Sequence, residues 1–191
     1  MNLSLGRHVY GLAAIAFGVI ALVWHDFNGW QQAQPLESVP HVVVFLLYFA
    51  AALEVLGGMA TQWQKTASVG AIALGAVYLM FALLWVPRIV AGPAAYDPWG
   101  NFFEQFSLVS GAIIVYASFE QRDAQQAMRI ARIGYLAFAI CVISFMLEQV
   151  FYLPMTASAV PKWIPPGQMF WAVATTIFFA LAARAFSRRS V

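Results

Sequence analysis

Six long apolar stretches separated by short polar segments dominate the hydropathy pattern of the 191-residue chain. A bilayer-spanning helix needs about 20 predominantly apolar residues, because the hydrocarbon core is about 30 Å thick. Each stretch approaches this length, so the pattern predicts an all-α polytopic membrane bundle with six transmembrane helices. The predicted spans are His8–Trp24, Val39–Thr61, Thr66–Pro87, Phe102–Phe119, Ile133–Tyr152 and Gly167–Ala183.

The composition places the whole chain in the membrane class. Apolar residues make up 62% and charged residues 9%, whereas soluble domains carry about 25% charged residues. A net charge of +2 without a basic stripe argues against a nucleic-acid partner. Cys141 is the only cysteine, which excludes an intramolecular disulfide and paired-cysteine metal sites. The first stretch lacks a cleavage motif, so we expect an uncleaved span.

Positively charged residues are distributed unevenly between the two sides of the predicted bundle. With six spans, one side carries Arg7, Lys65, Arg122, Arg129, Arg132, Arg184, Arg188 and Arg189, and the other carries Arg88 and Lys162. Because Lys and Arg are enriched in cytoplasmic loops, both termini are predicted to be cytoplasmic. Loops 26–38, 88–101 and 153–166 then face outward.

Glu54 is the one carboxylate inside the second predicted span, roughly 10 Å from its Thr61 end. A charge at that depth costs about 2.5–3.5 kcal/mol on insertion scales, so the side chain is expected to face the bundle interior. As a functional group it would relay protons, bind a cation or hydrogen-bond a polar ligand. As a structural group it would be protonated, or ionised and held by a residue of a neighbouring helix; the candidates are Tyr78, Ser110 and Tyr116.

A second set of polar residues falls at similar depth on the predicted outer side. Its members are His25, Asp26, His41, Glu104, Glu148 and Gln149. As a functional cluster it would ligate a metal or exchange protons with a quinone. The simpler alternative is that polar residues collect at the interface, with Arg88 paired to Glu104 or Glu148. No histidine or carboxylate spacing typical of a metal site occurs, so no metal is expected.

Several short motifs resemble the DoxX-like family of small bacterial membrane proteins. They are Gly6-Arg7, Phe17-Gly18, the run 51–58 (AALEVLGG), the run 101–104 (NFFE), Gly111 and the run 160–172 (VPKWIPPGQMFWA). The resemblance implies a four-span core over 1–119, a cytoplasmic linker over 120–132 and a C-terminal two-span hairpin over 133–191. It also implies location in the bacterial inner membrane. Relatives often carry histidines near Glu148 and near Thr176, and this chain lacks both.

Members of the family are linked to quinone-coupled redox systems as subunits beside a catalytic partner. The resemblance therefore implies an accessory subunit, or a bundle that binds a quinone or lipid, with a protein partner in the membrane. One alternative is a proton-linked transporter of an apolar or weakly acidic solute that uses Glu54. A third is a membrane enzyme acting on a lipid or quinone through Glu104, Glu148 and the histidines. Because no catalytic constellation of known spacing is present, the enzyme ranks last. Small-residue helix faces leave a homodimer as a further option.

Overall fold

The computed structural model describes residues 3–24, 41–119 and 123–189, and these residues contain helices and no β-strand. The helices, in chain order, are α1 (Leu3–Trp24), α2 (His41–Gln62), α3 (Ala67–Leu84), α4 (Val86–Ala91), α5 (Asp97–Ala117), α6 (Ala124–Phe151), α7 (Leu153–Ala159) and α8 (Gln168–Arg189). The predicted all-α class is thereby confirmed.

Five segments are long and apolar enough to cross a membrane. They are Leu5–Trp24, Val44–Gln62, Ala67–Ala91, Ala124–Phe151 and Gln168–Arg188. These five segments are the structural evidence that the protein belongs to the membrane class. Helix α5, which matches the fourth predicted span, has 21 residues but is more polar in its first half, and it is not among the five. Five of the six predicted spans therefore correspond to a segment that is long and apolar enough to cross a membrane.

Two predicted boundaries differ from the structure. Helix α6 begins at Ala124, inside the predicted linker 120–132, because the Asp123 side chain caps it by accepting from the backbone N–H groups of Gln125 (2.8 Å) and Gln126 (3.2 Å). Arg129 and Arg132, which were predicted to lie in this linker, therefore lie on helix α6. In the predicted outer loop 153–166, the chain forms the short helix α7, with a proline in its first turn.

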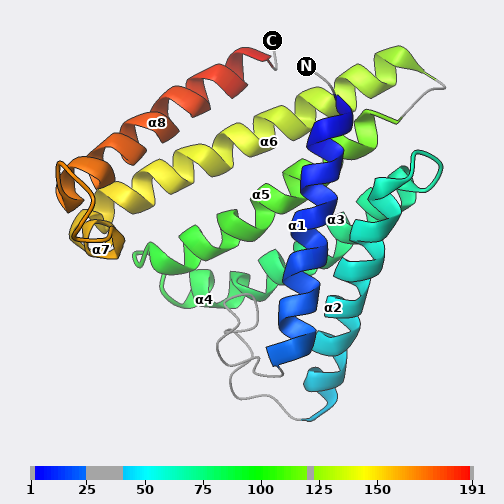
Figure 1. Ribbon diagram of the computed structural model, residues 1–191, viewed down its shortest axis with the longest axis horizontal. Helices are drawn as coiled ribbons and strands as arrows, with labels where there is room; N and C mark the ends of the chain where they lie inside the picture. The colour runs from blue at the N-terminus through cyan, green and yellow to red at the C-terminus, as the bar shows by residue number, and fades with distance from the viewer. Residues whose placement is uncertain (1–2, 25–40, 120–122, 190–191) are drawn as a thin grey trace.

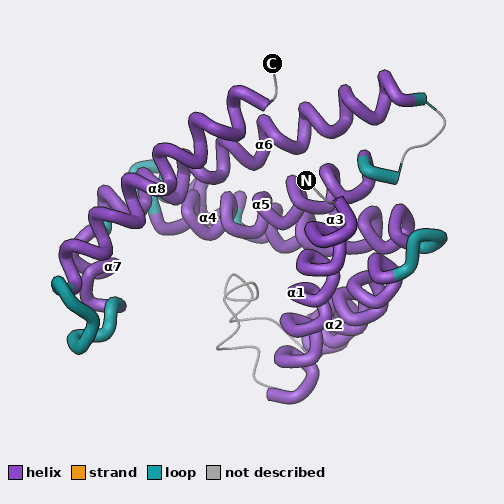
Figure 2. Tube along the Cα trace, turned by 45° about the horizontal axis from the view of Figure 1, so that its top comes forward, coloured by secondary structure: helices purple, strands orange, loops and turns teal. Residues whose placement is uncertain are grey.

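The helices pack in sequence order, with α5 as the central link. Helix α1 packs on α2, α2 on α3, α3 on α5, α5 on α6, and α6 on α8, while α7 packs against α8. Figure 1 and Figure 2 both show the α1–α2 pair running across the direction of α6 and α8. The predicted C-terminal hairpin is therefore the α6–α8 pair, and it joins the rest of the bundle through α5.

The α1–α2 interface depends on glycine at the crossing point. A Cβ atom added to Gly58 would lie 2.5 Å from the carbonyl oxygen of Gly11 and 2.8 Å from the Ile15 side chain. No side chain larger than hydrogen fits such a backbone approach. The two helices thus pack at very short range.

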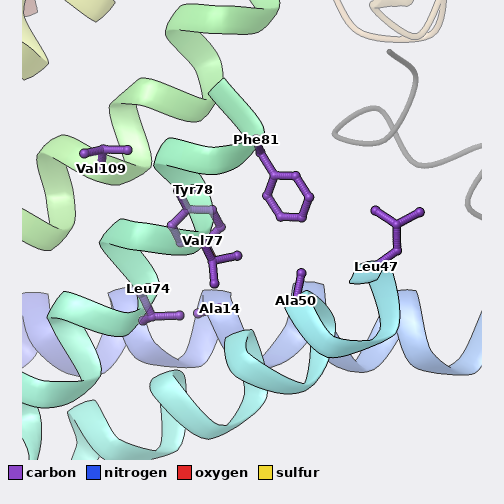
Figure 3. Packing of buried hydrophobic residues seen from close by; sticks show 8 residues of the cluster. All are labelled: Ala14, Leu47, Ala50, Leu74, Val77, Tyr78, Phe81 and Val109. Atoms are coloured by element: carbon purple, nitrogen blue, oxygen red, sulfur yellow. The ribbon is translucent and has the colours of Figure 1, made fainter. Parts of the chain in front are cut away.

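A compact apolar cluster fills the space between α1, α2, α3 and α5. Figure 3 shows it from close by, with four of its residues on α3 and the others on the three neighbouring helices. The cluster consists of Ala14, Leu47, Ala50, Leu74, Val77, Tyr78, Phe81 and Val109. This dense core lies beside Glu54, the one acidic residue of α2.

Candidate functional site

Glu54 lies in the interior of the bundle, with 0% of its side chain exposed. Its Cβ is close to Gly18 of α1, where an added Cβ would lie 3.0 Å away. Neither carboxylate oxygen has a hydrogen bond of good geometry to a described residue, but the Tyr78 hydroxyl lies close enough to act as a donor to the carboxyl group. A buried polar group normally has at least one partner, and Tyr78 is the candidate for that role here.

Two tyrosines supply the polar surroundings of Glu54. Tyr78 on α3 interacts electrostatically with the carboxyl group, and so does Tyr10 on α1. The Tyr10 hydroxyl donates to the carbonyl oxygen of Leu108 (2.9 Å), and its ring packs edge-on against Tyr78 at 6.5 Å. The structure thus places Tyr78 beside Glu54, as predicted. Tyr10 was not predicted, although it shares one face of α1 with Ala14 and Gly18 at four-residue spacing.

The other two predicted partners of Glu54 lie elsewhere. The Ser110 hydroxyl donates to the carbonyl oxygen of Phe106 (3.0 Å) and lies beside Cys141 of α6. Tyr116 lines a separate apolar groove of about 270 Å³ along α3 and α5. Both residues lie on α5, which packs on α3 and α6 rather than on α2. Of the three alternatives predicted for Glu54, Tyr78 is the one that the structure brings beside the carboxyl group, because hydropathy does not specify which helices are neighbours.

A larger cleft of about 710 Å³ is lined by residues of α5, α6, α7 and α8. Its wall combines acidic groups, hydroxyls, one amide, aromatic rings and aliphatic side chains. The lining residues are Asp97, Glu104, Ser107, Phe145, Glu148, Gln149, Tyr152, Met155, Thr156, Ala159 and Phe179. Pockets of about 300–1,000 Å³ with mostly apolar walls and a few polar groups are typical of small-molecule sites.

The acidic groups of the cleft surround a glycine of α5. A Cβ added to Gly100 would lie 2.6 Å from the Glu148 carboxylate, so this carboxylate of α6 occupies the recess that the missing side chain leaves. Asp97 and Glu104 lie within about one helical turn of Gly100 along α5, roughly 4.5 Å and 6 Å of helix rise away. Both act electrostatically on Glu148.

Three of the six residues predicted to cluster on the outer side meet in this cleft. They are Glu104, Glu148 and Gln149. His41 is the first residue of α2, and its side chain lies outside what the structure describes, as do His25 and Asp26 entirely. Glu104 and Glu148, the two acidic groups of the enzyme hypothesis, line the same cleft.

The predicted ion pair of Arg88 with Glu104 or Glu148 stays a prediction. The Arg88 guanidinium lies over the Trp85 ring, 5.2 Å from its centroid. A stacked arginine of this kind gains a cation–π contact at the end of the helix.

Tyr96 fixes the start of α5 against α6. Its hydroxyl donates to the carbonyl oxygen of Ser144 (3.0 Å) and lies 2.9 Å from the Ser144 hydroxyl. Burial raises the pKa of the Tyr96 hydroxyl above its usual value, which keeps it protonated as a donor. The contact holds Asp97, the next residue, at the edge of the cleft.

Within the described ranges, no group of three histidine, cysteine, aspartate or glutamate side chains is arranged to hold a metal ion. Comparisons with protein-family models, with curated proteins and with solved structures found no match to this chain. The resemblance to the DoxX-like family therefore stays a prediction, and the function is argued from the geometry.

Proposed function

We propose that this chain is a six-span, DoxX-like bundle that binds a hydrophobic ligand with a polar head group, a quinone or a lipid, as an accessory subunit of a membrane redox system. The observation that supports it most is the cleft, because Glu104, Glu148 and Gln149 line the same cavity as aromatic side chains. A polar end beside apolar walls is the lining that an amphipathic ligand needs.

Counting α5 as the sixth span fits its polar residues. Asn101 and Gln105 are 6% and 4% exposed, and Glu104 lines the cleft. Polar groups inside a membrane bundle face its interior or a cavity, so a more polar helix fits the central position between α3 and α6. Six spans place both termini on one side, and the charge bias makes that side the cytoplasmic face of a bacterial inner membrane.

The walls of the cleft suit the apolar part of such a ligand. Phe145 of α6 and Phe179 of α8 contribute rings whose centroids lie 5.9 Å apart, and Met155 of α7 contributes a flexible thioether. Aromatic and methionine side chains adapt well to a flat ring or an acyl chain. The polar head would then lie against Glu104, Glu148 and Gln149.

Filling the cleft tests this proposal. Ala159 of α7 lines it, and the neighbouring Ser158 is exposed but does not. We expect Ala159→Trp to reduce binding of a short-tailed benzoquinone and of a lysophospholipid, measured by thermal shift of the purified protein, while Ser158→Trp binds as the wild type does. Equal binding by both variants, or no binding by the wild type, would refute the cleft as the ligand site.

A proton-linked transporter is the second candidate, and the full burial of the Glu54 carboxyl group beside two tyrosines favours it. A buried acid that changes charge during a cycle would couple proton uptake to a change in packing. This candidate predicts that Glu54→Gln abolishes pH-dependent solute uptake into vesicles while the protein still folds. Unchanged uptake by the folded variant would exclude it.

A further inference from the structure

The Gln149 side chain links the cleft to two threonines of α8. Its Oε1 position lies 3.1 Å from the Thr175 hydroxyl oxygen and 2.9 Å from that of Thr176. Each threonine oxygen also lies within hydrogen-bonding distance of a backbone carbonyl one turn earlier, at 2.9 Å from Trp171 and 2.8 Å from Ala172. Neither threonine lines the cleft, whereas Gln149 does.

Counting protons decides the direction of these bonds. A hydroxyl group carries one proton, so each threonine donates either to its helix carbonyl or to Gln149. If both donate to the amide oxygen, their contacts to the carbonyl oxygens are not hydrogen bonds. If the amide is turned so that Nε2 faces α8, its two protons go to the two threonine oxygens, and both threonines donate to the carbonyls. The second arrangement makes four hydrogen bonds in place of two.

In the favoured arrangement, Gln149 presents its oxygen to the cleft. The groups beside it are also acceptors, because the Glu148 carboxylate rests on Gly100 between Asp97 and Glu104. Clustered carboxylates repel one another, so a cationic head group stabilises their ionised form, which accepts hydrogen bonds and donates none. The polar end of the cleft thus offers acceptors and negative charge to a ligand, next to the rings of Phe145 and Phe179.

We infer that the cleft selects an amphiphile whose head group is a primary ammonium, with Thr175 and Thr176 as the positioning residues that turn the Gln149 amide oxygen toward it. This inference rests on the proposed binding of an amphipathic ligand and, between the two ligand classes named there, favours a lipid with an amine head over a quinone, whose carbonyl oxygens only accept hydrogen bonds. An ammonium group carries three N–H donors and one positive charge, which match an amide oxygen and clustered carboxylates. Its apolar tail lies along the aromatic wall.

Four single-chain probes with the same alkyl tail test the inference at pH 7: a primary amine, a trimethylammonium, an alcohol and a carboxylate. Binding to the purified protein is measured by native mass spectrometry at equal probe concentrations. We expect the amine to bind about tenfold or more tightly than the alcohol, because charge-assisted hydrogen bonds are the stronger kind. The trimethylammonium, which lacks N–H donors, is expected to bind less tightly than the amine, and the carboxylate least.

Four variants distinguish binding in the cleft from partition of the probes into the detergent micelle. Gln149→Leu and Glu148→Gln are expected to remove the preference for the amine over the alcohol, and Gln126→Leu, on an exposed position of the same helix, to keep it. The double variant Thr175→Val, Thr176→Val is expected to weaken the preference. A thermal-unfolding scan of each variant confirms that it is folded.

The outcomes distinguish this inference from the proposed function. Equal binding of amine, alcohol and carboxylate, or a preference that survives Gln149→Leu and Glu148→Gln, overturns the ammonium assignment. If the benzoquinone binds and the amine does not, the inference fails while the proposed function stands. If none of these compounds binds the folded protein, both fail.

Discussion

Replacing Glu54 tests whether its carboxyl group stabilises the fold. If the group is kept for function and not for stability, an apolar replacement should make the protein more stable. The side chain is fully buried, and neither of its oxygens has a hydrogen bond of good geometry to a described residue, with the Tyr78 hydroxyl as the donor beside it. A carboxylate without a partner is very costly in such surroundings, and a neutral carboxylic acid fits them better. An apolar side chain of similar length would fit better still.

The expected size of the effect follows from the burial. An unsatisfied buried polar group costs about 1–3 kcal/mol in mutational data. Methionine is unbranched and adaptable, so it fills the Glu54 site with little strain. We therefore expect Glu54→Met to raise the free energy of unfolding by about 1–3 kcal/mol. Glu54→Gln, which keeps the shape and the polarity, should change it by less than about 1 kcal/mol.

Thermal or denaturant unfolding of the protein in a mild detergent measures these differences. Leu74→Ala is the control, because Leu74 is fully buried in the neighbouring core and its truncation should cost about 2–5 kcal/mol. A loss of stability in Glu54→Met larger than about 1 kcal/mol, with the control behaving as expected, would refute the reasoning. It would mean that Glu54 is stabilised by a bound group.

Three further substitutions test the packing. Gly58→Ala should lower stability by about 1–3 kcal/mol or more in unfolding experiments, because its Cβ would meet the rigid carbonyl of Gly11; an unchanged midpoint would argue against the close helix crossing. Gly100→Ala should leave the unfolding midpoint nearly unchanged, since the Glu148 carboxylate is the end of a flexible side chain, but weaken ligand binding in the thermal-shift assay; intact binding would show that the recess is not needed. Asp123→Ala removes the cap of α6 and should cost about 1 kcal/mol in the same unfolding assay, and a cost near zero would show that the cap contributes little.

The sequence was sufficient for the helical class and for most of the spans because both depend on the length and hydropathy of single segments. It was not sufficient for the ends of α6, where a capping aspartate starts the helix well before the apolar stretch begins. Nor does apolar periodicity reveal α7, whose seven residues lie in a segment with several prolines. Local side-chain bonding sets such boundaries, and hydropathy averages over it.

The candidate site was predictable only in part, because the position of a residue along a span can be counted from the sequence but the packing of the helices cannot. Counting residues along the spans predicted that Glu104, Glu148 and Gln149 lie near one another, and the structure places all three on the wall of one cleft. Which way each helix faces depends on packing, and this decided that Tyr78 approaches Glu54 while Ser110 lies against Cys141. Asp97 was missed because it lies before the apolar stretch, although its spacing of one to two turns from Glu104 would have indicated the shared face.

Native mass spectrometry of the protein, extracted gently from its own membranes, tests the central claim most directly. The account predicts that the wild-type chain carries a quinone, lipid or other amphiphile at stoichiometric level, that Ser158→Trp keeps it, and that Ala159→Trp loses it. A second polypeptide in the same complex would support the accessory-subunit role. A wild-type chain without any bound amphiphile, or the same adduct on all three proteins, would contradict the account.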